Sequence, residues 1–120
     1  MYQVCECVFS GGAVPRLVAV QGQVNEDGSY PIYRHPSDES PALLPFSPTV
    51  SMIREHVEKV LNHPVNHVLI QYYRSGNDYI SEHSDKTIDV VRDSSIVNVS
   101  FGAERYYCHL FFYLHSLTSV

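Results

Sequence analysis

The sequence predicts a single α+β domain that is mainly β, and three observations lead to this prediction. Its 120 residues suit one domain with a small core. Residues 47–62 carry apolar side chains at helical spacing, whereas the segments on either side are rich in β-branched and aromatic residues. One helix that braces antiparallel strands gives this class of fold.

The helix has a start signal, an apolar face and a stop signal. Ser47 is a good N-cap, and Pro48 suits the first helical position. Charged residues lie opposite an apolar stripe made of Val50, Ile53, Val57, Val60 and Leu61. We expect the helix to end near Asn62, before Pro64, and to be a structural brace laid against a sheet.

The region before the helix divides into strands and a loop. Residues 1–24 predict short strands interrupted by glycines and Pro15. The stretch "VNEDGSYPIYRHPSDESPALLPFSP" is dense in Pro, Asp and Ser, which predicts a turn at Asp27-Gly28 and then a long ordered loop. Long loops inside compact domains are often functional.

Three strand-like runs follow the helix. They are "NHVLIQYY", "YISEH" (79–83) and "SIVNVSFGAERYY" (95–107), with "RSGND" as a turn between the first two. The final segment, "YYCHLFFYLHSLTSV", is compatible with a buried strand and equally with an unpaired, aggregation-prone end.

Bulk properties narrow the function classes. The net charge of −5 weighs against a nucleic-acid binder but leaves room for a local basic patch. The three cysteines, Cys5, Cys7 and Cys108, and the absence of a charged-then-apolar leader favour an intracellular protein with free thiols. No apolar run reaches the roughly 20 residues needed to cross a membrane, so we expect no membrane partner, and we expect a monomer.

The candidate catalytic and metal-binding residues are His83 and Asp85. A non-haem Fe(II) site uses two histidines and one carboxylate on one face of an octahedron. Where a strand runs into a turn, residues i and i+2 project to the same side and can converge on one ion. The alternative is a solvated histidine beside an aspartate that caps a turn, and the pair by itself leaves both open.

A wider pattern surrounds this pair. It comprises Gln71-Tyr72-Tyr73, the turn at 75–78, His83-Ser84-Asp85 and a run from Ile96 to Arg105 of the form S-x-G-x-x-R. With the upstream "VPRLVAVQG" and "YPIYRHP", it resembles the AlkB-like Fe(II)/2-oxoglutarate-dependent dioxygenases over residues 12–105. The resemblance implies an incomplete double-stranded β-helix, jelly-roll-like, with one bracing helix.

The resemblance also implies residue roles. His83 and Asp85 match two iron ligands, and Tyr73 matches a contact to the co-substrate 2-oxoglutarate. Gln71 falls where the family more often has Asn and keeps the amide. In the lid-like region, Arg16 would meet a phosphate and Tyr33 would stack on a flipped base, with a solvated Arg and a packing Tyr as the alternatives.

The implied activity is oxidative demethylation. Cofactor and co-substrate would be Fe(II) and 2-oxoglutarate, and the partner would be nucleic acid with alkylated bases in DNA repair, with a nuclear location. We divide the chain into lid-like strands and loop (1–46), brace helix (47–62), core strands with the metal motif (66–105) and an atypical tail (106–120).

Two expected family features are missing after Arg105. The family's second iron histidine and its R-x5-R arginine should follow, yet no Arg or Lys occurs there, and only His109 and His115 could replace the histidine. We therefore expect a C-terminally truncated dioxygenase of doubtful activity. The alternative is a non-catalytic relative that binds nucleic acid or a protein through residues 13–36.

Overall fold

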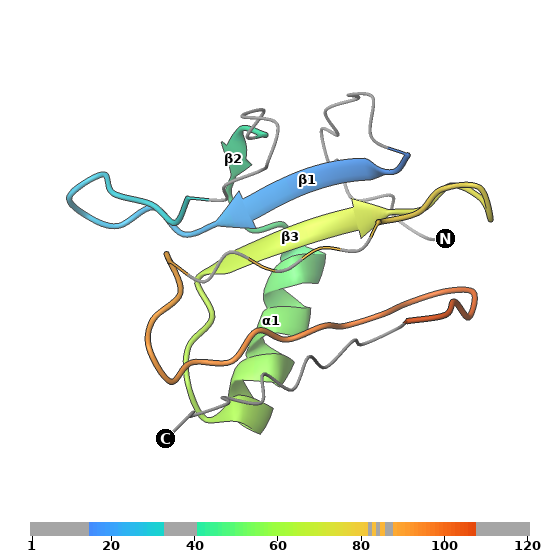
Figure 1. Ribbon diagram of the computed structural model, residues 1–120. Helices are drawn as coiled ribbons and strands as arrows, with labels where there is room; N and C mark the ends of the chain where they lie inside the picture. The colour runs from blue at the N-terminus through green and yellow to red at the C-terminus, as the bar shows by residue number, and fades with distance from the viewer. Residues whose placement is uncertain (1–14, 33–40, 82, 84, 86–87, 108–120) are drawn as a thin grey trace, which may run out of the picture.

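One helix and a three-stranded mixed sheet make up the regular structure (Figure 1). The computed structural model describes residues 15–32, 41–81, 83, 85 and 88–107. Its elements are β1 (Leu17–Gly22), β2 (Leu43–Leu44), α1 (Pro48–Leu61) and β3 (His67–Tyr72). The sheet order is β2-β1-β3, so the prediction of a mainly β domain with one helix is confirmed.

The pairing of the strands corrects the expectation of an antiparallel sheet. β1 pairs antiparallel with β3, from Leu17 opposite Tyr72 to Gly22 opposite His67. It pairs parallel with β2, which the sequence had not indicated. Two residues are too few to produce a periodic pattern, and the parallel pairing requires the intervening residues to cross over.

The core is centred on β1. Val18, Ala19 and Val20 are 7%, 0% and 2% exposed, and Gln21 is 2% exposed. A strand with a neighbour on each edge and cover on both faces is expected to be a continuous apolar run, as "LVAV" is here. The central position of β1 in the sheet therefore follows from this apolar run, which the sequence pattern predicts only as a short strand.

Gly22 lets neighbouring segments approach the end of β1. A Cβ placed on Gly22 would lie 2.9 Å from Cδ1 of Leu43 and 3.1 Å from the backbone oxygen of Asn66. Any larger residue would push against β2 on one side and against the residue before β3 on the other.

The predicted helix is confirmed at both ends. The Oγ atom of Ser47 accepts a hydrogen bond from the Val50 N–H at 3.3 Å, and Pro48 begins the helix. Asn62 ends it in the left-handed conformation with φ of 57°, and its N–H donates to the Glu58 carbonyl at 2.8 Å. Both caps satisfy backbone groups that a helix end would otherwise leave without partners.

The helix is attached to the sheet at its N-terminus and lies on one side of it (Figure 1). The Ser47 N–H donates to Oε1 of the buried Gln21 at 2.9 Å. Four stripe residues, Val50, Ile53, Val57 and Leu61, are half-buried. Val60 is 74% exposed, so its inclusion in the apolar stripe was wrong. Within the described residues, no helix is long and apolar enough to cross a membrane.

The strands expected at 79–83 and 95–107 are not formed in the described part of the chain. Figure 1 shows residues 88–107 as a trace without an arrow, away from the sheet. Ile96, Val97, Val99 and Phe101 are between 40% and 76% exposed. Hydrogen bonds to a neighbouring strand define a strand, and no described strand pairs with this segment.

The turn predicted at Asp27-Gly28 is confirmed. Gly28 has φ of 80°, and Asn25 accepts from its N–H at 3.0 Å. Asp27 Oδ1 accepts from the hydroxyl and the N–H of Ser29, which lowers the pKa of Asp27. Several predicted positions fall outside the described residues: Tyr33, the three cysteines, His109 and His115.

Candidate functional site

His83 and Asp85 face one another. Nε2 of His83 lies 3.7 Å from Oδ1 of Asp85, and both side chains are about half exposed. Nδ1 of His83 lies 2.8 Å from the carbonyl oxygen of Ser81. A carbonyl oxygen only accepts, so Nδ1 carries a proton, and in the neutral ring the lone pair is then on Nε2, the atom nearest the carboxylate. This tautomer is the one in which a histidine binds a metal through Nε2.

The donor set fits part of an Fe(II) site. Imidazole and carboxylate both suit Fe(II). Ligands at adjacent corners of an octahedron lie about 3 Å apart when each bond is about 2.1 Å, so His83 and Asp85 need only a small approach. Across the described ranges, however, no group of three or more His, Cys, Asp or Glu side chains could hold an ion. The pair brings one imidazole and one carboxylate together, and its role as two ligands of a facial site stays a prediction.

Gln71 and Tyr73 form a second pair at the end of β3. Because they are two residues apart, their side chains project to the same side of the chain. The Tyr73 hydroxyl donates to Oε1 of Gln71 at 3.0 Å. The ring of Tyr73 is half-buried, and the guanidinium carbon of Arg105 lies 4.4 Å from its centroid. The phenol is thus held at its hydroxyl and on its face.

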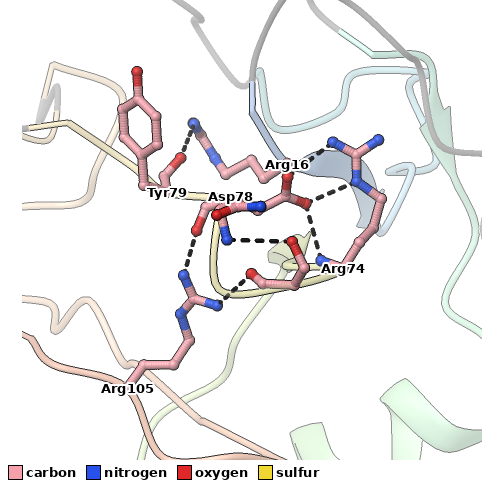
Figure 2. A network of polar contacts seen from close by, with 7 residues as sticks. Arg16, Arg74, Asp78, Tyr79 and Arg105 are labelled. Carbon is pink, nitrogen blue, oxygen red and sulfur yellow. Dashed lines mark hydrogen bonds and ion pairs between the residues drawn. The ribbon is translucent and has the colours of Figure 1, made fainter.

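The turn after Tyr73 is built around the carboxylate of Asp78 (Figure 2). Asp78 accepts from Nε of Arg74 at 2.7 Å, from its NH2 group at 2.9 Å and from its backbone N–H at 2.9 Å. The hydrogen bonds from the Arg74 side chain and backbone lower the pKa of Asp78 to about 2. The same ion pair raises the pKa of Arg74. The carboxylate remains ionised at neutral pH and fixes the turn.

Two further arginines reach the same turn, as Figure 2 shows. Arg105 donates through NH1 to the carbonyl of Ser75 at 3.1 Å and through NH2 to the carbonyl of Asp78. Arg16 donates through NH1 to the carbonyl of Tyr79 at 3.5 Å. The turn therefore joins three segments that are far apart in sequence: the start of β1, the end of β3 and the segment that ends at Arg105.

Arg16 lies inside this junction and not on an open surface. It is 8% exposed, and its Nε atom has no hydrogen-bond partner among the described residues. The Tyr79 N–H donates to the carbonyl of Pro15 at 3.0 Å, directly beside Arg16. These contacts give Arg16 a structural role, and its contact with a phosphate stays a prediction.

Four of the predicted residues thus form two pairs. In the part of the chain that the structure describes, no hydrogen bond or ion pair joins the His83 and Asp85 pair to the Gln71 and Tyr73 pair. Sequence reasoning missed the Asp78 junction and the contact between Arg105 and Tyr73. One available signal was the opposite charges of Arg74 and Asp78 around Gly76, and another was the arginine that closes S-x-G-x-x-R.

Comparison with known proteins identifies the family. The model of the 2OG-Fe(II) oxygenase superfamily matches residues 2–109. The chain belongs to this superfamily. The match spans both pairs of side chains and the junction between β3 and Arg105, and no solved structure matches the chain significantly.

The similar curated proteins agree with an AlkB-like member of the family. DNA oxidative demethylase ALKBH2 of Homo sapiens is 43% identical over 61 residues, which is 51% of this chain and 23% of that protein. The Bos taurus protein of the same name is 39% identical over 61 residues (51% and 22%). Uncharacterized protein R406 of Acanthamoeba polyphaga mimivirus is 37% identical over 62 residues (52% and 32%). The matched residues thus span less than a third of each of these relatives. The family match and the two relatives named ALKBH2 confirm the AlkB-like resemblance.

Proposed function

We propose that this chain supplies part of an AlkB-like oxidative demethylase that removes N-methyl lesions from nucleic-acid bases. The observation that supports it best is the His83 and Asp85 pair, with Nε2 and Oδ1 facing one another at 3.7 Å inside the segment matched by the family model. The relatives named as DNA oxidative demethylases favour DNA as the nucleic acid. A location inside the cell, in the nucleus, belongs to the same proposal.

The proposal gives each pair a task. His83 and Asp85 would hold Fe(II), and the Ser81 carbonyl keeps the imidazole in the tautomer that this requires. Tyr73 and Gln71 would contact 2-oxoglutarate through the hydroxyl and the amide. When bound, Fe(II) would activate O2, the oxidant for hydroxylation of an N-methyl carbon, with 2-oxoglutarate as the co-reductant that is converted to succinate and CO2. Arg16 and Tyr33 would lie on the side of the substrate.

The proposal also includes the architecture of the domain. Family membership supports an incomplete double-stranded β-helix, of which β1 and β3 would be part. We retain the division into residues 1–46, 47–62, 66–105 and 106–120. Because the matched residues span less than a third of each relative, the activity of a whole demethylase is proposed for the chain and not assigned to it.

The first test is metal and co-substrate binding. Anaerobic addition of Fe(II) and 2-oxoglutarate should give a weak visible charge-transfer band, because the co-substrate chelates the bound iron. His83→Ala should abolish the band, whereas His56→Ala, at an exposed position of α1, should retain it. A wild-type protein without the band, or a His83→Ala protein that keeps it, would refute the iron site.

A second candidate function is a non-catalytic binding module that uses residues 13–36. The absence of a third ligand among the described residues favours it. Binding of a methylated oligonucleotide, measured by fluorescence anisotropy with and without Mn(II), separates the two functions. Equal affinity with and without metal, unchanged by His83→Ala, supports the module. An affinity that depends on metal supports the demethylase.

A further inference from the structure

We propose that Arg105 is a positioning residue that holds the ring of Tyr73 in place for the co-substrate. The inference rests on the proposed function, because that function makes Tyr73 a contact to 2-oxoglutarate. The predicted roles leave Arg105 without a task, although it closes the S-x-G-x-x-R pattern. The structure places it directly on Tyr73.

The Arg105 guanidinium is held in a defined plane. Its NH1 and NH2 groups donate to two different carbonyls, those of Ser75 and Asp78 (Figure 2). A planar guanidinium bound at both ends of its fork has little freedom to rotate. Those carbonyls belong to the turn whose conformation the ion pair between Arg74 and Asp78 fixes.

Tyr73 depends on such contacts for its orientation. It directly follows β3, so its ring lies beyond the last pair of the sheet, Leu17 with Tyr72. The hydrogen bond to Gln71 restrains the hydroxyl, and the guanidinium of Arg105 lies 4.4 Å from the ring centroid. A cation over a ring face is attracted by the ring quadrupole, so the ring rests against a fixed surface.

Lysine cannot replace arginine at position 105. Lysine keeps the positive charge but is a point charge on a flexible stem, without the planar fork that spans two carbonyls. Arg105→Lys therefore distinguishes two roles of Arg105. If Arg105 holds the Tyr73 ring, the variant should lose this function, whereas if its positive charge only attracts the 2-oxoglutarate anion, the variant should retain it. Arg92→Lys is the matched control, because Arg92 is an exposed arginine on the same segment.

The contact itself is tested without any ligand. In protein labelled with 3-fluorotyrosine, the Tyr73 fluorine signal is assigned from its loss in Tyr73→Phe. Arg105→Lys should shift that signal, and Arg92→Lys should leave it in place. The Nε–H resonance of Arg105 offers a second measurement that leaves Arg105 intact, since its upfield ring-current shift should vanish in Tyr73→Leu. Signals that do not respond in either experiment overturn the inference.

The functional consequence is tested by a double-mutant cycle on 2-oxoglutarate affinity, with Mn(II) as the metal and calorimetry as the measurement. Arg105→Lys should weaken binding about fivefold, and Arg92→Lys should not. In a Tyr73→Leu background, Arg105→Lys should have no further effect if Arg105 acts through the ring. A purely structural role would weaken binding equally in both backgrounds.

The outcomes separate the inference from the function on which it rests. Wild-type protein that does not bind 2-oxoglutarate would overturn the proposed function and, with it, the role of Arg105 toward the co-substrate. Binding that is equally strong in the wild-type and Arg105→Lys proteins would overturn only the inference. If Arg105→Lys weakens 2-oxoglutarate binding in the wild-type background and has no effect in the Tyr73→Leu background, the result would support the proposed function and the inference.

Discussion

Two regions of the chain are rich in β-forming side chains: the segments 17–22 and 67–72 together, and residues 88–107. Only the first region forms a sheet. In β1, Val18, Ala19 and Val20 are at most 7% exposed. In the second region, Val97 and Val99 are 40% and 48% exposed. The difference lies in the neighbours, because β1 has a paired strand on each edge and the second region has none among the described residues. Strand propensity describes how well a side chain fits a pleated surface, and it does not supply that surface.

The two regions meet at the turn around Asp78. Arg105 crosses from the end of the second region to the carbonyls of that turn and to the ring of Tyr73. The junction is made of charged and polar groups, whereas the centre of the sheet is apolar. In the junction, the second region is therefore held by the side-chain contacts of Arg105, whereas the strands of the first region are held by backbone pairing along their whole length.

The largest contrast is expected from one substitution made in both regions. Val20→Ala should lower the free energy of unfolding by about 2 to 3 kcal/mol, because it removes two buried carbons and leaves a cavity. Val99→Ala should change it by less than about 0.5 kcal/mol, since Val99 is half exposed. Urea denaturation followed by circular dichroism measures both. A loss at Val99 equal to that at Val20 would show that the second region packs into a core.

A smaller effect is expected at two glycines. Gly22→Ala should cost about 1 to 2 kcal/mol, because the new methyl group would press on Leu43 and on the Asn66 carbonyl. Gly76→Ala is the control, since a Cβ there would meet nothing within 4 Å. It should be neutral or slightly stabilising. Equal losses at the two positions would contradict the close approach at the end of β1.

The smallest effect concerns pH at the junction between the regions. The pKa of Asp78 is lowered to about 2, so its ion pair contributes stability above the ordinary pKa of an aspartate. This contribution is lost as the pH falls through about 4 to 2. Asp78→Asn should lower the free energy of unfolding at pH 6. It should also reduce the dependence of that free energy on pH between about 4 and 2, the acid limb of the stability curve, and Arg74→Gln should have a similar effect. Unfolding curves recorded at several pH values test this, and an unaltered acid limb in both variants would exclude the ion pair as the cause.

Features that depend on neighbouring residues in the chain were predicted well. The cap at Ser47, the helix end at Asn62 and the turn at Asp27-Gly28 agree with the structure, because each is made by contacts within a few residues. The segments 79–83 and 95–107 were predicted as strands from composition alone, and this was wrong for the described residues. The parallel partner β2 was missed, because it is recognisable only from its pairing with β1.

The candidate site divides in the same way. The spacing of His83 and Asp85, and of Gln71 and Tyr73, is a property of the sequence, and two residues suffice to place each pair on one side of the chain. The tertiary structure decided the burial of Arg16 and the stacking of Arg105 on Tyr73. The physical reason is range: spacing along the chain fixes local projection, whereas a contact between distant segments exists only once the chain has folded.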